Sequence, residues 1–72
     1  MSVAWQETLM KAGADEAVIV QLGLTSARGQ WCRDEVVGLL KRFFSTDNIR
    51  DPVAYLHRGV QSIEHQYAQW SR

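Results

Sequence analysis

The sequence predicts an all-α fold, a small bundle of three to four helices in a single domain of residues 1–72. Apolar residues recur every three or four positions between breaker residues, and no stretch shows the strict alternation and hairpin turns of a β-sheet. Hydrophobic residues make up 46% of the chain, and three Trp, two Tyr and two Phe are among them, which is enough for one core. At 72 residues a single core is only marginally sufficient, and oligomerisation or a partner often adds stability.

The first predicted helix is short and runs from about Val3 to Ala12. Trp5 and Leu9 lie one turn apart on its apolar face. Gly13 follows directly, and glycine is the residue that most often ends a helix.

A second helix is predicted to begin at Asp15 and Glu16, whose charges suit the positive end of a helix dipole, and to continue through AVIVQL to Gly23. This segment is apolar almost throughout, which indicates that most of it is buried. The Thr-Ser pair that follows is a candidate N-cap for the next helix. The conformation of residues 24–30 stays open between helix and loop.

The third predicted helix, from Trp31 to Phe44, is the core helix. Its apolar residues fall on one arc, with two more at the edges: Cys32, Val36, Leu39, Leu40 and Phe43, flanked by Val37 and Phe44. On the opposite face acidic and basic residues are mixed, among them Glu35 and Arg42, and this mixture is typical of a solvated surface.

The last helix is predicted to run from Pro52 to about Trp70, with Asp51 as its N-cap. Proline suits the first position because its missing N–H has no partner there in any helix. A narrow apolar stripe is expected to pack on the bundle: Leu56, Val60, Ile63, Tyr67 and Trp70, with Val53 at its edge. The other face is expected to meet solvent and carries Tyr55, Arg58, Ser62, His65, Gln66 and Gln69.

Charge and cysteine content limit the possible settings and partners. Eight basic and eight acidic residues give a formal charge of zero, so the chain lacks the overall basic excess typical of proteins that bind phosphate with their whole surface. The single cysteine, Cys32, predicts a reducing, intracellular setting, and we expect a cytoplasmic protein. The apolar runs are broken by polar residues before they reach spanning length, so no membrane insertion is expected.

No group of residues indicates a reaction. His57 and His65 are eight residues apart, two turns distant and rotated around the axis, whereas helical metal-binding pairs sit three or four apart. Both are expected to be polar surface residues, and Cys32 to be a core residue rather than a nucleophile. We therefore expect no enzymatic activity, no cofactor, no metal and no small-molecule substrate.

The segment EAVIVQLGLTSARGQWCRDEVV has the order of a helix-turn-helix: a short apolar helix, a glycine at the turn and a second helix. It departs from that pattern at two positions. Ile19 stands where alanine is usual, and Gly29 stands where a branched apolar residue is usual. Two interpretations stay open, a degenerate helix-turn-helix and a simple antiparallel helix pair, and the departures favour the second.

Three stretches of the chain resemble the C-terminal helical region of replication-initiation and primosomal-type proteins of plasmids, phages and integrated elements. They are QLGLTS, EVVGLLKRFF and NIRDPVAYLHRGVQ. The resemblance covers about residues 18–62. Its matching residues form an LG-apolar turn and an I-R-x-P-x-x-Y-L helix start: Leu22, Gly23, Leu24, Ile49, Arg50, Pro52, Tyr55 and Leu56. The resemblance implies a module that contacts DNA or a replication partner such as a helicase, and the zero net charge indicates an accessory role.

Two functions remain open from the sequence. The first, which the resemblance favours, is a small accessory or regulatory DNA-associated protein of a mobile or replicating element that binds DNA or a replication protein. The second is a non-enzymatic protein-interaction adaptor, with a homodimer as one form of it, anchored by aromatic side chains. The predicted binding residues are basic or aromatic: Arg28, Trp31, Arg33, Arg50, Tyr55, Arg58 and His65.

Overall fold

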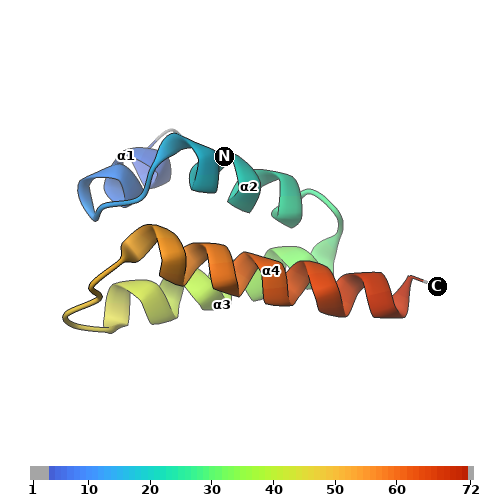
Figure 1. Cartoon of the computed structure of the whole chain (residues 1–72). Coiled ribbons are helices and arrows are strands. Elements are labelled where there is room, and N and C mark those ends of the chain that lie inside the picture. The colour runs from blue at the N-terminus through green and yellow to red at the C-terminus, as the bar shows by residue number, and fades with distance from the viewer. Residues whose placement is uncertain (1–3, 72) are drawn as a thin grey trace.

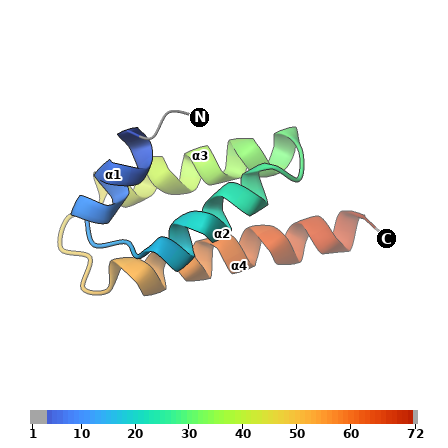
Figure 2. The same ribbon diagram turned by 90° about the horizontal axis from the view of Figure 1, so that it is seen from above.

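The computed structural model describes residues 4–71, and these residues form four helices and no strand. The helices are α1 (Ala4–Lys11), α2 (Glu16–Ser26), α3 (Gln30–Ser45) and α4 (Pro52–Trp70). α3 and α4 lie side by side in opposite directions, α2 lies across both of them on one side, and α1 lies at the end next to the α3–α4 loop (Figures 1 and 2). The all-α bundle is confirmed, while Val3, the expected start of α1, lies outside the described residues.

The predicted end of α1 and the predicted starts of α2 and α4 are confirmed. Gly13 follows α1 with a φ of +106°, a left-handed conformation that glycine adopts without steric cost. At α2, Asp15 Oδ1 accepts a hydrogen bond of 2.9 Å from the Val18 N–H. At α4, Asp51 Oδ1 accepts one of 3.1 Å from the Ala54 N–H, directly before the N-terminal proline. Both aspartates are therefore N-caps.

The second helix is longer than the sequence indicated. α2 does not end at Gly23 but continues to Ser26, and the connection to α3 is confined to residues 27–29. Thr25 and Ser26 are buried in the last turn of α2 and do not cap α3, because the Ser26 hydroxyl donates to the Gly23 carbonyl at 3.0 Å. The glycine of the proposed helix-turn-helix thus lies within the first helix rather than at the turn.

One hydrophobic core joins all four helices. Its buried apolar residues are Leu9, Ala14, Val18, Ile19, Leu22, Cys32, Val36, Leu39, Phe43, Leu56, Val60 and Ile63. Cys32 is a core residue, as predicted, and burial raises the pKa of its thiol. The prediction for Leu40 was wrong, because this side chain is only half-buried at the edge of the arc.

The Leu39 side chain of α3 occupies the space that a side chain on Gly59 of α4 would take. A Cβ atom built on Gly59 would lie 2.7 Å from Leu39 Cδ2, well inside van der Waals contact. Leu39 is itself buried, so its side chain has little room to move away. The absence of a side chain at residue 59 therefore sets the separation of the two long helices.

Replacing Gly59 by alanine should separate α3 from α4. Overpacking a core costs about 1–3 kcal/mol, and the gain in helix propensity from glycine to alanine returns about 1 kcal/mol, so we expect a net loss of up to about 2 kcal/mol. Gly38→Ala in α3 is the matched control, since a Cβ there meets nothing within 4 Å. It should stabilise the protein by up to about 1 kcal/mol. Chemical denaturation measures both, and changes of the same sign would contradict the proposed contact.

Asp51→Ala should remove the N-cap of α4 and lower the free energy of unfolding by about 1 kcal/mol. Asp47→Ala is the control, because Asp47 is exposed in the same loop and caps no helix. Thermal melting followed by circular dichroism compares the two variants. An equal melting temperature for both would show that the cap contributes nothing to stability.

Candidate functional site

The structure separates the sequence-predicted binding residues into two groups and two single residues. Arg28 and Trp31 lie at the end of the bundle where α2 turns into α3. Arg50, Tyr55 and Arg58 lie at the opposite end, around the start of α4. Two others stand apart from both groups and are exposed: Arg33 on α3 and His65 on α4.

Arg28 forms an ion pair inside the molecule. Its Nε lies 2.6 Å from Glu64 Oε2, and its guanidinium carbon lies 5.6 Å from the centre of the Tyr67 ring. The hydrogen bond from Arg28 lowers the pKa of Glu64, and partial burial of this carboxyl opposes the shift. Because its charge is matched by Glu64, Arg28 connects the α2–α3 turn to α4 and is a weak candidate for binding phosphate.

Trp31 is not free to stack on a base with its whole ring. It is half-buried and lies against Trp70, with ring centres 4.3 Å apart and ring planes tilted by 59°. Trp70 was predicted to pack into the bundle, but 64% of its surface is exposed. It contacts Trp31 near the end of α4, beyond the buried part of the helix, which ends at Ile63.

Tyr55 occupies a different position from the one predicted. It is half-buried rather than on the solvated back of α4, and its ring centre lies 5.8 Å from that of Phe43 in α3. The reason is the close contact at Gly59, one turn further along α4. That contact places α3 against the flank of α4 that carries Tyr55 and Gly59.

Two adjoining hollows meet at Tyr55. One, of about 330 Å³, is lined by Thr46, Ile49, Arg50, Asp51, Tyr55 and Arg58. The other, of about 340 Å³, is lined by Leu39, Arg42, Tyr55, Arg58 and Gly59. Tyr55 and Arg58 belong to both. We call this surface, with Arg42, Arg50 and Arg58 around Tyr55, the basic hollow.

The basic hollow carries a local excess of positive charge. Its three arginines face one carboxylate, Asp51, which gives a formal charge of +2 (three minus one). One oxygen of Asp51 already accepts the N-cap hydrogen bond. Within residues 4–71 the ion pair of Arg28 with Glu64 is the one observed, so the arginines of the hollow are not paired with a described carboxylate. Unpaired guanidinium groups suit the oxygens of an anion.

Arg42 is the residue of this site that the sequence analysis missed. It was assigned to the mixed solvated face of α3. The structure brings it to the same hollow as Arg58 because it lies one turn after Leu39, on the edge of α3 that approaches Gly59. In the sequence, the position of Arg42 near the hollow is indicated only by its spacing of three residues from Leu39. That spacing places Arg42 beside Leu39 on α3, but it does not tell which edge of α3 faces α4.

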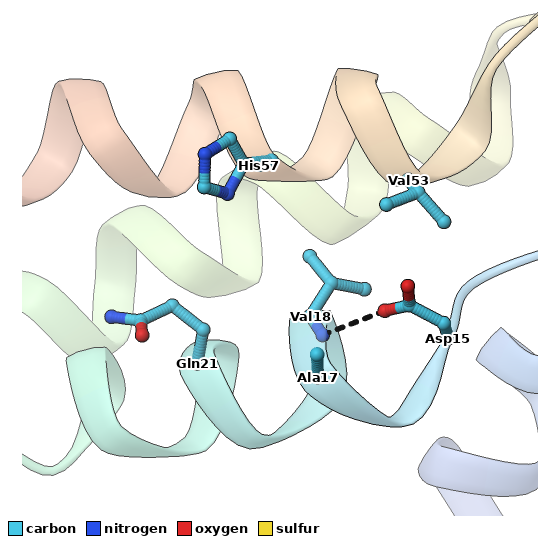
Figure 3. A pocket seen from close by; sticks show the side chains of 6 residues that line it. All are labelled: Asp15, Ala17, Val18, Gln21, Val53 and His57. Carbon is cyan, nitrogen blue, oxygen red and sulfur yellow. Dashed lines mark hydrogen bonds between the residues drawn. The ribbon is translucent and has the colours of Figure 1, made fainter.

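A smaller hollow of about 230 Å³ lies between α2 and α4. His57 and Val53 of α4 face Gln21 and Val18 of α2 across it, and the Asp15 carboxylate at its edge is turned to the Val18 N–H (Figure 3). It is below the usual size of a small-molecule site, and its carboxylate is already used as an N-cap.

Two searches of residues 4–71 bear on other kinds of site. No three His, Cys, Asp or Glu side chains gather there in a way that could hold a metal ion. Among the helices of this part of the chain, none has the length and apolar character needed to cross a bilayer. Comparison of the chain with protein-family models, with curated proteins and with solved structures found no match.

The ion pair of Arg28 with Glu64 predicts a pH-dependent stability. A carboxyl whose pKa is lowered in the folded state stabilises the protein above its unfolded pKa, and this contribution is lost as pH falls through the lowered value. Glu64→Gln should therefore melt at a lower temperature than the parent at neutral pH and at the same temperature in strong acid. Glu7→Gln, at an exposed position of α1, is the control. A pH-independent difference between Glu64→Gln and the parent would exclude the ion pair as its cause.

Proposed function

We propose that this protein is a small DNA-associated accessory protein that holds the nucleic-acid backbone in the basic hollow. The observation that carries the proposal is the convergence of Arg42, Arg50 and Arg58 around one half-buried tyrosine. Three of the four residues were singled out from the sequence, and the fourth, Arg42, comes from the preceding helix α3. Arginines of α3, of α4 and of the loop between them thus form a local site for an anion, although the net charge of the chain is zero.

Each residue type contributes in its own way. A guanidinium group donates two parallel hydrogen bonds to phosphate oxygens, so neighbouring arginines can hold successive phosphates of one strand. Tyr55 presents the exposed part of its ring between them, and contact of an aromatic ring with a base contributes about 1–3 kcal/mol when it is complete. Since Phe43 covers part of Tyr55, we expect less than that.

The zero net charge limits what such a protein does. Long-range attraction to DNA is weak, and binding depends on a few local phosphate contacts. This favours an accessory role on DNA, or on DNA already held by a replication partner, over independent recognition of an origin. The proposal places the arginines on phosphates, which carry no sequence information, so we expect weak sequence preference.

A protein-interaction adaptor is the second candidate, and a specific observation supports it. Several large apolar side chains expose about half of their surface or more, among them Phe44, Leu24 and Trp70. Exposed aromatic residues are common anchors of protein interfaces. The two functions differ in their dependence on salt, because phosphate contacts weaken steeply as counterions compete and apolar contacts do not.

Titration with single- and double-stranded DNA at two salt concentrations tests the proposal. The double variant Arg42→Gln and Arg58→Gln should bind at least about tenfold more weakly than the parent, and its salt slope should fall by roughly two, one for each lost phosphate contact. Arg33→Gln is the matched control, because Arg33 is an exposed arginine of α3 outside the hollow. Absence of salt-sensitive binding by the parent would refute the DNA function and leave the adaptor. An equal effect of Arg33→Gln would refute the assignment to the hollow.

A further inference from the structure

α2 has no polar face. Its inner side lies in the core, with Val18, Ile19 and Leu22 buried. Its outer side begins with the exposed Glu16 and then carries only apolar or small residues at exposed positions: Ala17, Val20 and Leu24 within the helix and Ala27 directly after it. Val20 is 52% exposed and Leu24 61% exposed, one turn apart. Helices on a protein surface normally turn polar residues to solvent, so this outer side is typical of a helix that packs against something further.

Val20 and Leu24 form an apolar ridge on α2, and an apolar groove runs beside this ridge, between α2 and α1. It has a volume of about 410 Å³ and is lined by Trp5, Gln6, Met10, Glu16, Ile19, Val20 and Gly23. Met10 is itself 56% exposed at the groove. Gly23 leaves the wall of the groove open, because a Cβ there would meet no atom within 4 Å. The surface thus holds an apolar ridge and an apolar groove side by side.

We propose that this surface is the interface of a homodimer, in which α2 of one copy packs against α2 of a second copy about a two-fold axis near Val20. A two-fold interface needs a projecting part and a receiving part on the same patch, at equal distances on either side of the axis. Helical spacing puts Leu24 on the flank of Val20 away from α1, and puts Ile19 and Gly23 on the flank that faces the groove. Rotation about Val20 pairs position 24 with position 16, so Leu24 of each copy lies beside Glu16, at the end of the other copy's groove.

Charge also favours a second copy as the occupant. Among residues 4–71, Glu16 is the one charged residue that lines the groove, and the outer side of α2 between residues 17 and 27 carries none. The axis at Val20 keeps the two copies of Glu16 on opposite sides of the interface. The chain as a whole has a formal charge of zero, so two copies approach without net repulsion. A strongly charged partner would find a single charge, that of Glu16, on this patch.

The dimer leaves the basic hollow free. His57 and Glu64 lie on the flank of α4 next to α2, where they meet Gln21 and Arg28. Tyr55 and Arg58 lie on another flank, and α2 covers only one side of the α3–α4 pair (Figures 1 and 2). The inference therefore does not depend on the proposed DNA function, and each can fail without the other.

Sedimentation velocity and light scattering over a concentration series up to the millimolar range test the dimer directly. The parent should pass from monomer to dimer within the series. Leu24→Glu and the milder Leu24→Ser should remain monomeric, with circular dichroism as a check on folding. Val37→Glu is the matched control, because Val37 is an exposed apolar residue of α3 outside the groove. It should dimerise like the parent.

Disulfide trapping locates the axis independently. Val20→Cys should form a covalent dimer under mild oxidation, since residue 20 of each copy lies next to the axis, whereas Val37→Cys should not. The native Cys32 is fully buried and does not compete in this reaction. A parent that stays monomeric throughout the concentration series overturns the proposal, as does a dimer that Leu24→Glu leaves intact. The proposal is also overturned if the parent is a monomer that binds a different protein and Leu24→Glu abolishes that binding. In that case the surface is occupied by the other protein and not by a second copy.

Discussion

The contact between Gly59 of α4 and Leu39 of α3 is the constraint on which the arrangement of the bundle depends. Helices pack by fitting the side chains of one into the spaces of the other, and their separation depends on the residues at the point of contact. Because residue 59 has no side chain, Leu39 lies directly against the backbone of α4. This close approach decides which flank of each long helix is turned to the other.

The basic hollow follows from that contact. Tyr55 lies one turn before Gly59 and therefore packs against Phe43 in the seam, the line of contact between α3 and α4. Arg42 lies one turn after Leu39, and Arg58 precedes Gly59 directly, so two arginines from different helices line the same hollow. At the other end of the seam the ion pair of Arg28 with Glu64 connects the α2–α3 turn to α4, and there the arginine's charge is matched. The first end keeps the positive charge of the basic hollow available for a ligand.

The molecule offers different chemistry on different sides. The seam of α3 and α4 carries the arginines, while the outer side of α2 and its groove toward α1 are apolar and nearly uncharged. A core of this size stabilises a 72-residue chain only modestly, so an apolar helix face left in water is a feature that association would relieve. The two surfaces are compatible with one another, because a partner on α2 leaves the seam open.

The sequence by itself determined the all-α class, the N-cap of α4 at Asp51, the start of α2 at Asp15 and Glu16, the end of α1 at Gly13 and nearly all buried positions of α3 and α4. These features depend on residues within one or two turns, and so they can be read from local spacing. Tertiary structure decided the rest: the half-buried places of Leu40 and Tyr55, the exposure of Trp70, the length of α2 and the part of Arg42 in the basic hollow. Periodicity gives the angle of a residue around its own helix axis. It does not say which neighbouring helix covers that angle, because this depends on contacts, such as that between Gly59 and Leu39, that join residues far apart in the chain.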